Sequence, residues 1–114
     1  MRTYTQMGTC GYGTVYVMEK MEDFDEYEKI LGRDHIERFN PNFYEFKKEF
    51  KERMGTWWED KKQLRYMYNG KPVYARYKII GLEDNNPSMD WYWIVQNEND
   101  PRDVRYINCN DPDF

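Results

Sequence analysis

The stretch that decides the fold runs from Lys61 to Ile80, KKQLRYMYNGKPVYARYKII, with Asn69-Gly70 at its centre. Both central residues of a type I′ turn need positive φ, which glycine adopts freely and asparagine tolerates. Strand-like runs flank this dipeptide on both sides, so they predict a β-hairpin closed by Asn69-Gly70. On the second strand of the hairpin two sets of residues alternate, as in a half-buried sheet: Val73, Ala75, Tyr77 and Ile79 against Tyr74, Arg76, Lys78 and Ile80.

The chain before the hairpin predicts one strand and two helices. Residues 14–18 form a β-branched and aromatic run that is typical of a strand. The first helix begins near Asp23 or Asp25, either of which can cap it, and it ends at Gly32. Residues 33–39 add one or two further helical turns.

The second helix has the clearer start and stop signals. Asn42 can cap it, or Asn40 can do so with Pro41 in the first helical position. Gly55 is a natural C-terminal stop. An apolar stripe with spacings of three and four must pack on another element, and it consists of Phe43, Phe46, Phe50 and Met54.

The chain after the hairpin predicts two more strands. Residues 83–88 form a polar turn, 89–96 a third strand, 97–103 a polar loop and 104–109 a last strand, and 110–114 are a loose tail. The inward-facing residues of the third strand are Trp91, Trp93 and Val95. We therefore predict an α+β fold in which an N-terminal strand and two helices precede a three- to four-stranded antiparallel meander, with the helices on one face.

Length and composition favour one domain, residues 1–114. Aromatic residues make up 18% of the chain, with 11 Tyr, 6 Phe and 4 Trp, and they supply most of the area available for burial. The two cysteines, Cys10 and Cys109, are too few for a disulfide framework or a thiolate zinc site. No apolar run approaches the roughly 20 residues that span a membrane, and no secretory signal opens the chain. We expect a cytoplasmic protein with reduced thiols and no membrane contact.

Charge is unevenly distributed along the chain. Residues 61–80 carry six cations and no carboxylate, whereas residues 1–60 have a net charge of −4 and residues 83–114 of −6. Cations interleaved with tyrosines suit single-stranded nucleic acid, because cations meet phosphates while rings stack on bases. The alternative is a solvated hairpin face whose cations pair with acids on neighbouring strands, with Asp90 and Asp103 as candidate partners.

The acidic C-terminal third mirrors this bias. Its carboxylates can steer a basic groove of a partner toward this surface, or they can serve solubility alone. The candidate acidic surface consists of Asp90, Glu98, Asp100 and Asp103.

The aromatic content exceeds what one small core needs, and interface centres are enriched in Tyr, Trp, Met and Arg. Tyr92 and Ile94 lie on the face of the sheet opposite Trp91 and Trp93. Together with Tyr74 and Ile80 they form an exposed apolar patch if helices cover only one face of the sheet. Alternatively, the N-terminal segment or a second subunit covers them. Together with the hairpin they make the candidate partner-binding set, which is Tyr66, Tyr68, Lys71, Tyr74, Arg76, Lys78, Tyr92 and Ile94.

The sequence contains no recognisable catalytic, cofactor-binding or metal-binding motif. His35 is the only histidine, and although Asp34 can orient it as a general base, no motif ties a nucleophile to it. We therefore predict no catalytic residue, no cofactor and no metal, and we assign His35 to the surface or to a cap.

Three functions follow, in order of preference. The first is a small non-enzymatic interaction or inhibitor protein that binds a protein or nucleoprotein, with a homodimer as one arrangement. Size and a Tyr-, Asn-, Asp- and Lys-rich composition suit a phage or mobile-element accessory protein of the anti-defence, anti-CRISPR-like kind, which would act in the host cytoplasm. The second is nucleic-acid binding through the basic, Tyr-rich hairpin 61–80. The third is a small nuclease or nucleotide-processing enzyme.

Overall fold

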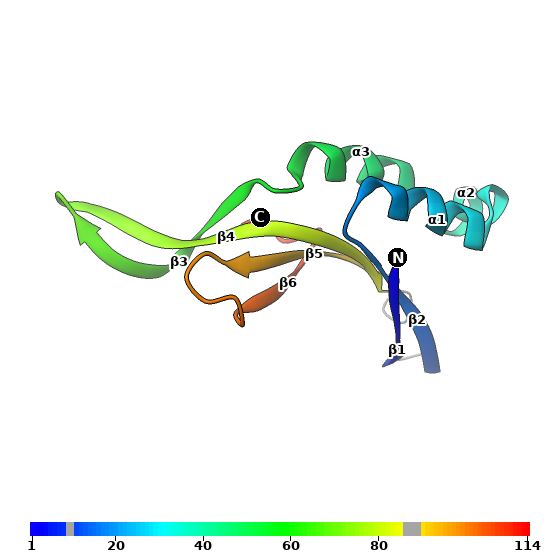
Figure 1. Ribbon diagram of the computed structural model, residues 1–114, viewed down its shortest axis with the longest axis horizontal. Coiled ribbons are helices and arrows are strands. Elements are labelled where there is room, and N and C mark those ends of the chain that lie inside the picture. The colour runs from blue at the N-terminus through cyan, green and yellow to red at the C-terminus, as the bar shows by residue number, and fades with distance from the viewer. Residues whose placement is uncertain (9–10, 86–89) are drawn as a thin grey trace.

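A computed structural model describes residues 1–8, 11–85 and 90–114 (Figure 1). Strands come first, helices follow, and antiparallel strands complete the chain, which confirms the predicted α+β class. Within the described ranges the elements are β1 (Arg2–Gly8), β2 (Gly11–Met18), α1 (Met21–Leu31), α2 (Arg33–Phe39), α3 (Phe43–Arg53), β3 (Trp57–Tyr68), β4 (Lys71–Asn85), β5 (Asp90–Asn97) and β6 (Val104–Asn108).

One antiparallel sheet contains all of these strands, and β4 is its organising member. The strand order is β1-β2-β4-β5-β6, with β3 also paired to β4. β2 pairs with residues 82–85 of β4 and β3 pairs with residues 71–78, so these two strands follow one another along the same edge. β1, which the sequence patterns did not indicate, pairs with β2 and extends the sheet by an N-terminal hairpin.

The helices cover one face of the sheet (Figure 1). α1 ends at Gly32, as predicted, and its Phe24 and Tyr27 are buried against the sheet, whereas Ile30 is exposed. The predicted stripe of α3 is also confirmed, because its three phenylalanines are buried against the sheet. Asn42 is the N-cap residue of α3, one of the two predicted positions, but its side chain makes no capping hydrogen bond.

The sheet contributes the other half of this core. Its inward-facing side chains are Ala75, Tyr77, Ile79, Leu82, Trp91, Trp93, Val95 and Ile107. The three residues predicted to face inward on β5, Trp91, Trp93 and Val95, are confirmed. A smaller apolar cluster lies on the opposite face, where Val15 and Val17 of β2 pack with Ile94. The N-terminal hairpin therefore covers Ile94, which is only 3% exposed, and this is one of the alternatives that the sequence left open.

The predicted hairpin forms, and it extends well beyond the rest of the sheet (Figure 1). Asn69 and Gly70 have φ of 49° and 76°, as the predicted type I′ turn requires. β5 pairs with β4 only from Tyr77 onward, so the first residues of β4 are paired with β3 alone. The molecule is consequently elongated, with principal extents of 55 × 29 × 24 Å. We call residues 61–76 the β-arm.

The C-terminal segment differs from the loose tail that the sequence predicts. The Phe114 ring lies against Trp58 and Trp93, and the Arg53 guanidinium stacks 4.3 Å from its centre. Trp58 Nε1 donates a hydrogen bond to the Asp113 carbonyl at 3.0 Å. Aromatic packing and main-chain hydrogen bonds thus hold these residues against the sheet.

Two expectations concern residues that the structure does not describe. Cys10 lies outside the described ranges, so its distance from the free, half-buried Cys109 is not assigned. Residues 86–89, which belong to the predicted polar turn and the start of the third strand, also lie outside them.

No helix within the described ranges is both long enough and apolar enough to cross a membrane.

Candidate functional site

The β-arm owes its direction to irregular pairing between β3 and β4. Asp60 is opposite Ala75, but the next paired residue of β3, Leu64, is already opposite Tyr74, and a second register shift follows before Tyr66. Extra residues on one strand bend it and increase its twist. The bulge therefore redirects the outer part of the β-arm relative to the sheet.

A polar cluster holds the base of the β-arm. Arg105 of β6 donates hydrogen bonds to Asp60 at 2.8 Å and to Gln63 at 2.7 Å. These two residues lie at the start and near the end of the bulged segment of β3, so Arg105 holds the segment in place. The Tyr77 hydroxyl donates to Asp103 at 2.6 Å and also lies 2.9 Å from the Gln63 amide oxygen. The Arg105 guanidinium stacks 4.5 Å from the centre of the Tyr77 ring. Planar, multidentate contacts of this kind fix the orientation of the arm.

The same cluster shifts the acidity of two of its members. Burial and the hydrogen bond to Asp103 raise the pKa of the Tyr77 hydroxyl. The hydrogen bond from Tyr77 lowers the pKa of the Asp103 carboxyl, and Arg105 lowers it further. Asp103 therefore remains a carboxylate acceptor, and Tyr77 remains a donor, across the physiological pH range.

Beyond this base, the tip of the β-arm exposes large apolar side chains. Leu64, Tyr66, Met67 and Tyr68 are 56%, 51%, 57% and 65% exposed. They occupy neighbouring positions near the Asn69-Gly70 turn, on a ribbon with no third strand beside it in the described chain. Large apolar groups gathered on one projecting element are typical of an interaction surface.

The cations of the β-arm are only partly neutralised. Lys61 pairs with Glu59 at 2.9 Å, Lys62 with Asp113 at 2.9 Å and Arg76 with Glu98 at 3.4 Å. Arg65 reaches Asn99, whose amide oxygen, once the amide is turned to accept, lies 2.6 Å from one guanidinium nitrogen. The sequence suggested Asp90 and Asp103 as partners of Lys71, Arg76 and Lys78, and this is wrong. Arg76 pairs with Glu98, Asp103 pairs with Arg105, and Asp90 makes no ion pair with a described residue.

The predicted partner-binding residues divide into three groups. Tyr66, Tyr68 and Lys71 lie together at the tip of the β-arm. Tyr74, Arg76 and Lys78 lie nearer its base. There the Lys61 ammonium lies 4.9 Å from the centre of the Tyr74 ring, and the Arg76 guanidinium lies 4.5 Å from the centre of the Trp57 ring. Tyr92 lies on β5 beside the N-terminal hairpin, and Ile94 is buried. The structure thus unites the tip residues and separates the others from them.

The predicted acidic residues likewise do not form one surface. Glu98, Asp100 and Asp103 lie in or beside the β5–β6 loop, where each already holds a nearby cation or backbone N–H. Asp90 lies at the opposite end of β5, next to Glu45 and Glu49 of α3. The β5–β6 loop therefore serves mainly to brace the β-arm.

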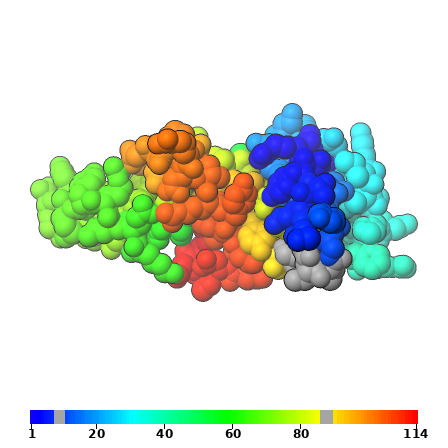
Figure 2. All heavy atoms as spheres, turned by 90° about the horizontal axis from the view of Figure 1, so that it is seen from below, coloured from blue at the N-terminus to red at the C-terminus, as the bar shows by residue number. Residues whose placement is uncertain are grey.

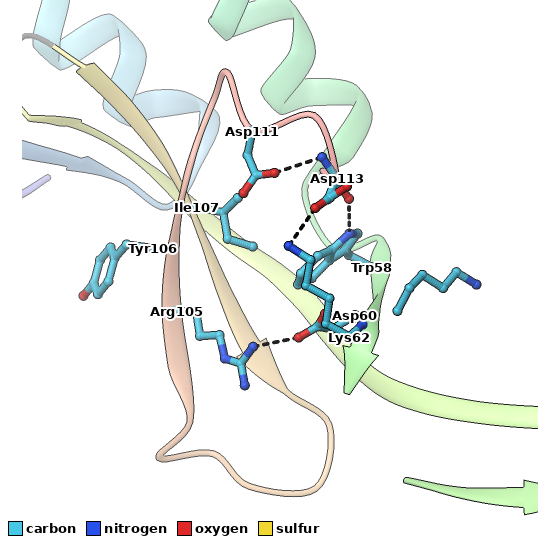
Figure 3. A pocket seen from close by; sticks show the side chains of 9 residues that line it. Trp58, Asp60, Lys62, Arg105, Tyr106, Ile107, Asp111 and Asp113 are labelled. Atoms are coloured by element: carbon cyan, nitrogen blue, oxygen red, sulfur yellow. Dashed lines mark hydrogen bonds and ion pairs between the residues drawn. The ribbon is translucent and has the colours of Figure 1, made fainter. Parts of the chain in front are cut away.

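A pocket of about 320 Å³ lies between the base of the β-arm, β6 and the C-terminal segment (Figure 3). Its polar groups are largely paired with one another, since Arg105 contacts Asp60 while Asp113 bonds to Trp58 and Lys62. Figure 3 shows these contacts crossing the pocket between the two sides. The pocket is therefore a part of the support of the β-arm.

Sequence reasoning missed Leu64 and Met67 as tip residues, because apolar residues in a predicted strand are normally assigned to the core. It also missed Arg105, whose partners Asp60 and Gln63 on β3 are more than 40 residues away in the chain. His35 lies on α2, exposed, with its ring 4.9 Å from Phe39.

Among the described residues, no group of three or more His, Cys, Asp or Glu side chains is arranged to hold a metal ion. Searches of family models, curated proteins and solved structures give no significant match to this chain.

Proposed function

We propose that this protein is a non-enzymatic interaction protein that binds a protein partner, alone or within a nucleoprotein complex, through the tip of the β-arm. The observation that carries this proposal is the exposure of four large apolar side chains at the end of a braced, projecting hairpin. Burial of apolar surface in an interface stabilises the complex by about 25 cal/mol per Å². Tyr and Met are enriched in the buried centres of interfaces, and Tyr is enriched among the residues that contribute most of the binding free energy.

The backbone of the β-arm supports the same conclusion. From Lys71 to Ala75, one edge of β4 has no paired strand among the described residues, and the outer edge of β3 is also unpaired there. An edge of this kind accepts an extended segment of a partner as an additional strand. The side chains at the tip then select the partner.

Charge indicates the chemistry of that partner. Lys71 at the tip and Lys78 beside the base of the β-arm are exposed cations, and neither has an ion pair within the described chain. An apolar groove with acidic residues around it is complementary to a tip of this composition. Inhibition would follow if that groove is a functional site of the partner.

Nucleic-acid binding by the β-arm is the second candidate, and it is supported by the cations and exposed tyrosines at the tip. We rank it lower for two reasons. Three of the six cations already pair with Glu59, Glu98 and Asp113, so the phosphate-binding charge is reduced. Leu64 and Met67 present aliphatic surface, which phosphates and sugars do not require.

Site-specific photo-crosslinking in the host cell tests the first candidate. A photoreactive phenylalanine analogue replaces Tyr68 at the tip or, as the matched control, Tyr12, which is 79% exposed but lies on β2. We expect a discrete crosslinked protein from position 68 only, and its loss when Leu64→Asp and Met67→Asp are added. Identical products from both positions, or no effect of the two substitutions, would contradict the proposal.

Titration with labelled oligonucleotides at two salt concentrations tests the second candidate. Phosphate contacts make the affinity fall steeply with salt, and losing one contact lowers the slope by roughly one. Lys71→Glu should then weaken binding, whereas Lys48→Glu on the exposed side of α3 should not. Absence of binding at low salt would exclude this candidate.

A further inference from the structure

A second site, unrelated to the β-arm, lies on the face of the sheet opposite the helices. In Figure 2 the yellow part of the chain, which comprises the end of β4 and the start of β5, shows between the blue β1 and the orange-red β6. The cleft at this place has a volume of about 530 Å³. Its lining comes from β1, β4, β5 and β6, and consists of Tyr4, Gln6, Glu83, Asn85, Tyr92 and Tyr106.

Among the described residues that line this cleft, Glu83 carries the charge. Its side chain comes from β4 and only 3% of the residue is exposed, yet it makes no ion pair within the described chain. The Tyr4 hydroxyl donates a hydrogen bond to its Oε2 at 2.8 Å. Burial raises the pKa of Glu83, and the charge of Arg2 opposes this shift without direct contact. The Arg2 guanidinium is paired with Glu19 at 3.5 Å and does not line the cleft. A buried carboxylate without a cation is costly, so a bound cation would stabilise it.

The other walls of the cleft suit an organic cation. Three of its six described lining residues are tyrosines, and Tyr4 and Tyr106 are 40% and 51% exposed, so their rings are available to a ligand. The faces of aromatic rings attract cations, and cages of several rings recognise alkylammonium groups. Among the residues that the structure describes, no lysine or arginine lines the cleft, which disfavours an anionic ligand.

We propose that this cleft binds an alkylammonium group, with the tyrosine rings contacting its alkyl substituents and the Glu83 carboxylate balancing its charge. Such a group is carried by a small free amine or by a lysine or methylated lysine side chain. Tyr4 would act as a positioning residue, because its hydroxyl fixes the carboxylate at the floor of the cleft. The proposal is independent of what the β-arm binds.

Proton NMR of the whole chain with tetramethylammonium as the probe tests this. We expect an upfield shift of the probe's methyl signal from the ring currents, with ring-signal changes at Tyr4, Tyr92 and Tyr106. The neutral isostere 3,3-dimethylbutan-1-ol should bind at least about tenfold more weakly, because the carboxylate–cation attraction is lost. Equal binding of the neutral compound, or no binding of the cation, would overturn the proposal.

Variants locate the site. Glu83→Gln should weaken the cation at least about tenfold, and Tyr106→Leu on the edge strand about fivefold, because each removes one of the two attractions. Tyr44→Leu on α3, which lies on the other side of the sheet, is the matched control and should leave the affinity unchanged. If Glu83→Gln fails to fold, Tyr106→Leu decides, and wild-type affinity in that variant would contradict the proposal.

Two further titrations distinguish the sources of the ligand. A glycine-flanked peptide with a central trimethyl-lysine, compared with the same peptide carrying norleucine, reports a side-chain ligand. Tighter binding of the trimethyl-lysine peptide than of tetramethylammonium would assign the cleft to a protein-borne cation. Binding of tetramethylammonium alone would assign it to a free amine, and binding of neither would refute it.

Discussion

The hydroxyl of Tyr27 on α1 donates a hydrogen bond to the carboxylate of Asp84 on β4, inside the core between the helices and the sheet. Asn40 extends this contact, since its amide donates to the Tyr27 hydroxyl at 2.8 Å and accepts from Trp91 Nε1 at 3.1 Å. Burial raises the pKa of Asp84 to about 6, although the hydrogen bond from Tyr27 opposes the shift. A titratable group thus connects the helical layer to the sheet.

Asp84→Asn should remove a pH-dependent cost of folding. The folded-state pKa of about 6 exceeds the ordinary value of 3.8, so the folded protein binds this proton more tightly than the unfolded chain does. The cost is absent below about pH 4, grows up to pH 6 and is complete above it, where it reaches about 3 kcal/mol. Urea unfolding from pH 4 to pH 7 should show wild type losing stability relative to the variant. Parallel curves would contradict this.

Gly70→Ala should destabilise the β-arm by about 1 kcal/mol. The φ of Gly70 is +76°, where an L side chain is strained, although a Cβ there would meet no atom within 4 Å. Backbone strain is therefore the only cost. Hydrogen exchange of the β3 amides should accelerate, while Asn69→Gly, which keeps the turn accessible, should leave it close to wild type. Unchanged exchange in the alanine variant would be evidence against the type I′ turn.

Arg105→Lys should loosen the β-arm. Lysine lacks the planar fork with which the guanidinium donates from two separate nitrogens to Asp60 and Gln63, at 2.8 and 2.7 Å, so it does not reproduce this geometry. Because the cluster is partly exposed, we expect a loss of only about 1 kcal/mol in global stability. Amide exchange at residues 64–68 should rise much more than in the core. Arg102→Lys, at a side chain 95% exposed, is the matched control and should change neither measurement.

Phe114→Ala should expose Trp58 and Trp93, whose ring centres lie 5.3 and 6.3 Å from that of Phe114. We expect a red shift of tryptophan fluorescence and a loss of about 1–2 kcal/mol. Phe39→Ala on α2 serves for comparison, since Phe39 is 62% exposed and should contribute little. A fluorescence spectrum that does not change would place the tryptophans out of contact with the C-terminal segment.

The elements that were predictable from the sequence are those fixed by local chemistry. Asn69-Gly70 specifies its turn through two φ angles, and the α3 stripe specifies a buried face through spacing. β1 was not predictable, because its residues Arg2–Gly8 are mostly polar and exposed, so no alternation distinguishes them from a loop. Its strand conformation comes from pairing with β2.

The residues of the cleft and of the core network show the opposite case. Glu83, Asp84 and Asn85 follow one another at positions that resemble a solvated turn, yet all three are buried in β4. Their burial depends on Tyr4, Tyr27 and Gln6, which lie 57 to 79 residues earlier in the chain. A local pattern carries no signal for such partners, so only the fold identifies these carboxylates as buried.

β4 also sets a fixed distance within the molecule. Its Lys71 end lies at the tip of the β-arm and its Glu83 lines the cleft, so a single strand connects the two surfaces. Twelve residues at about 3.3 Å each separate them by at most about 40 Å. Because both surfaces belong to one strand, a macromolecule held at the tip and a cation held in the cleft would keep a constant separation and a constant relative orientation.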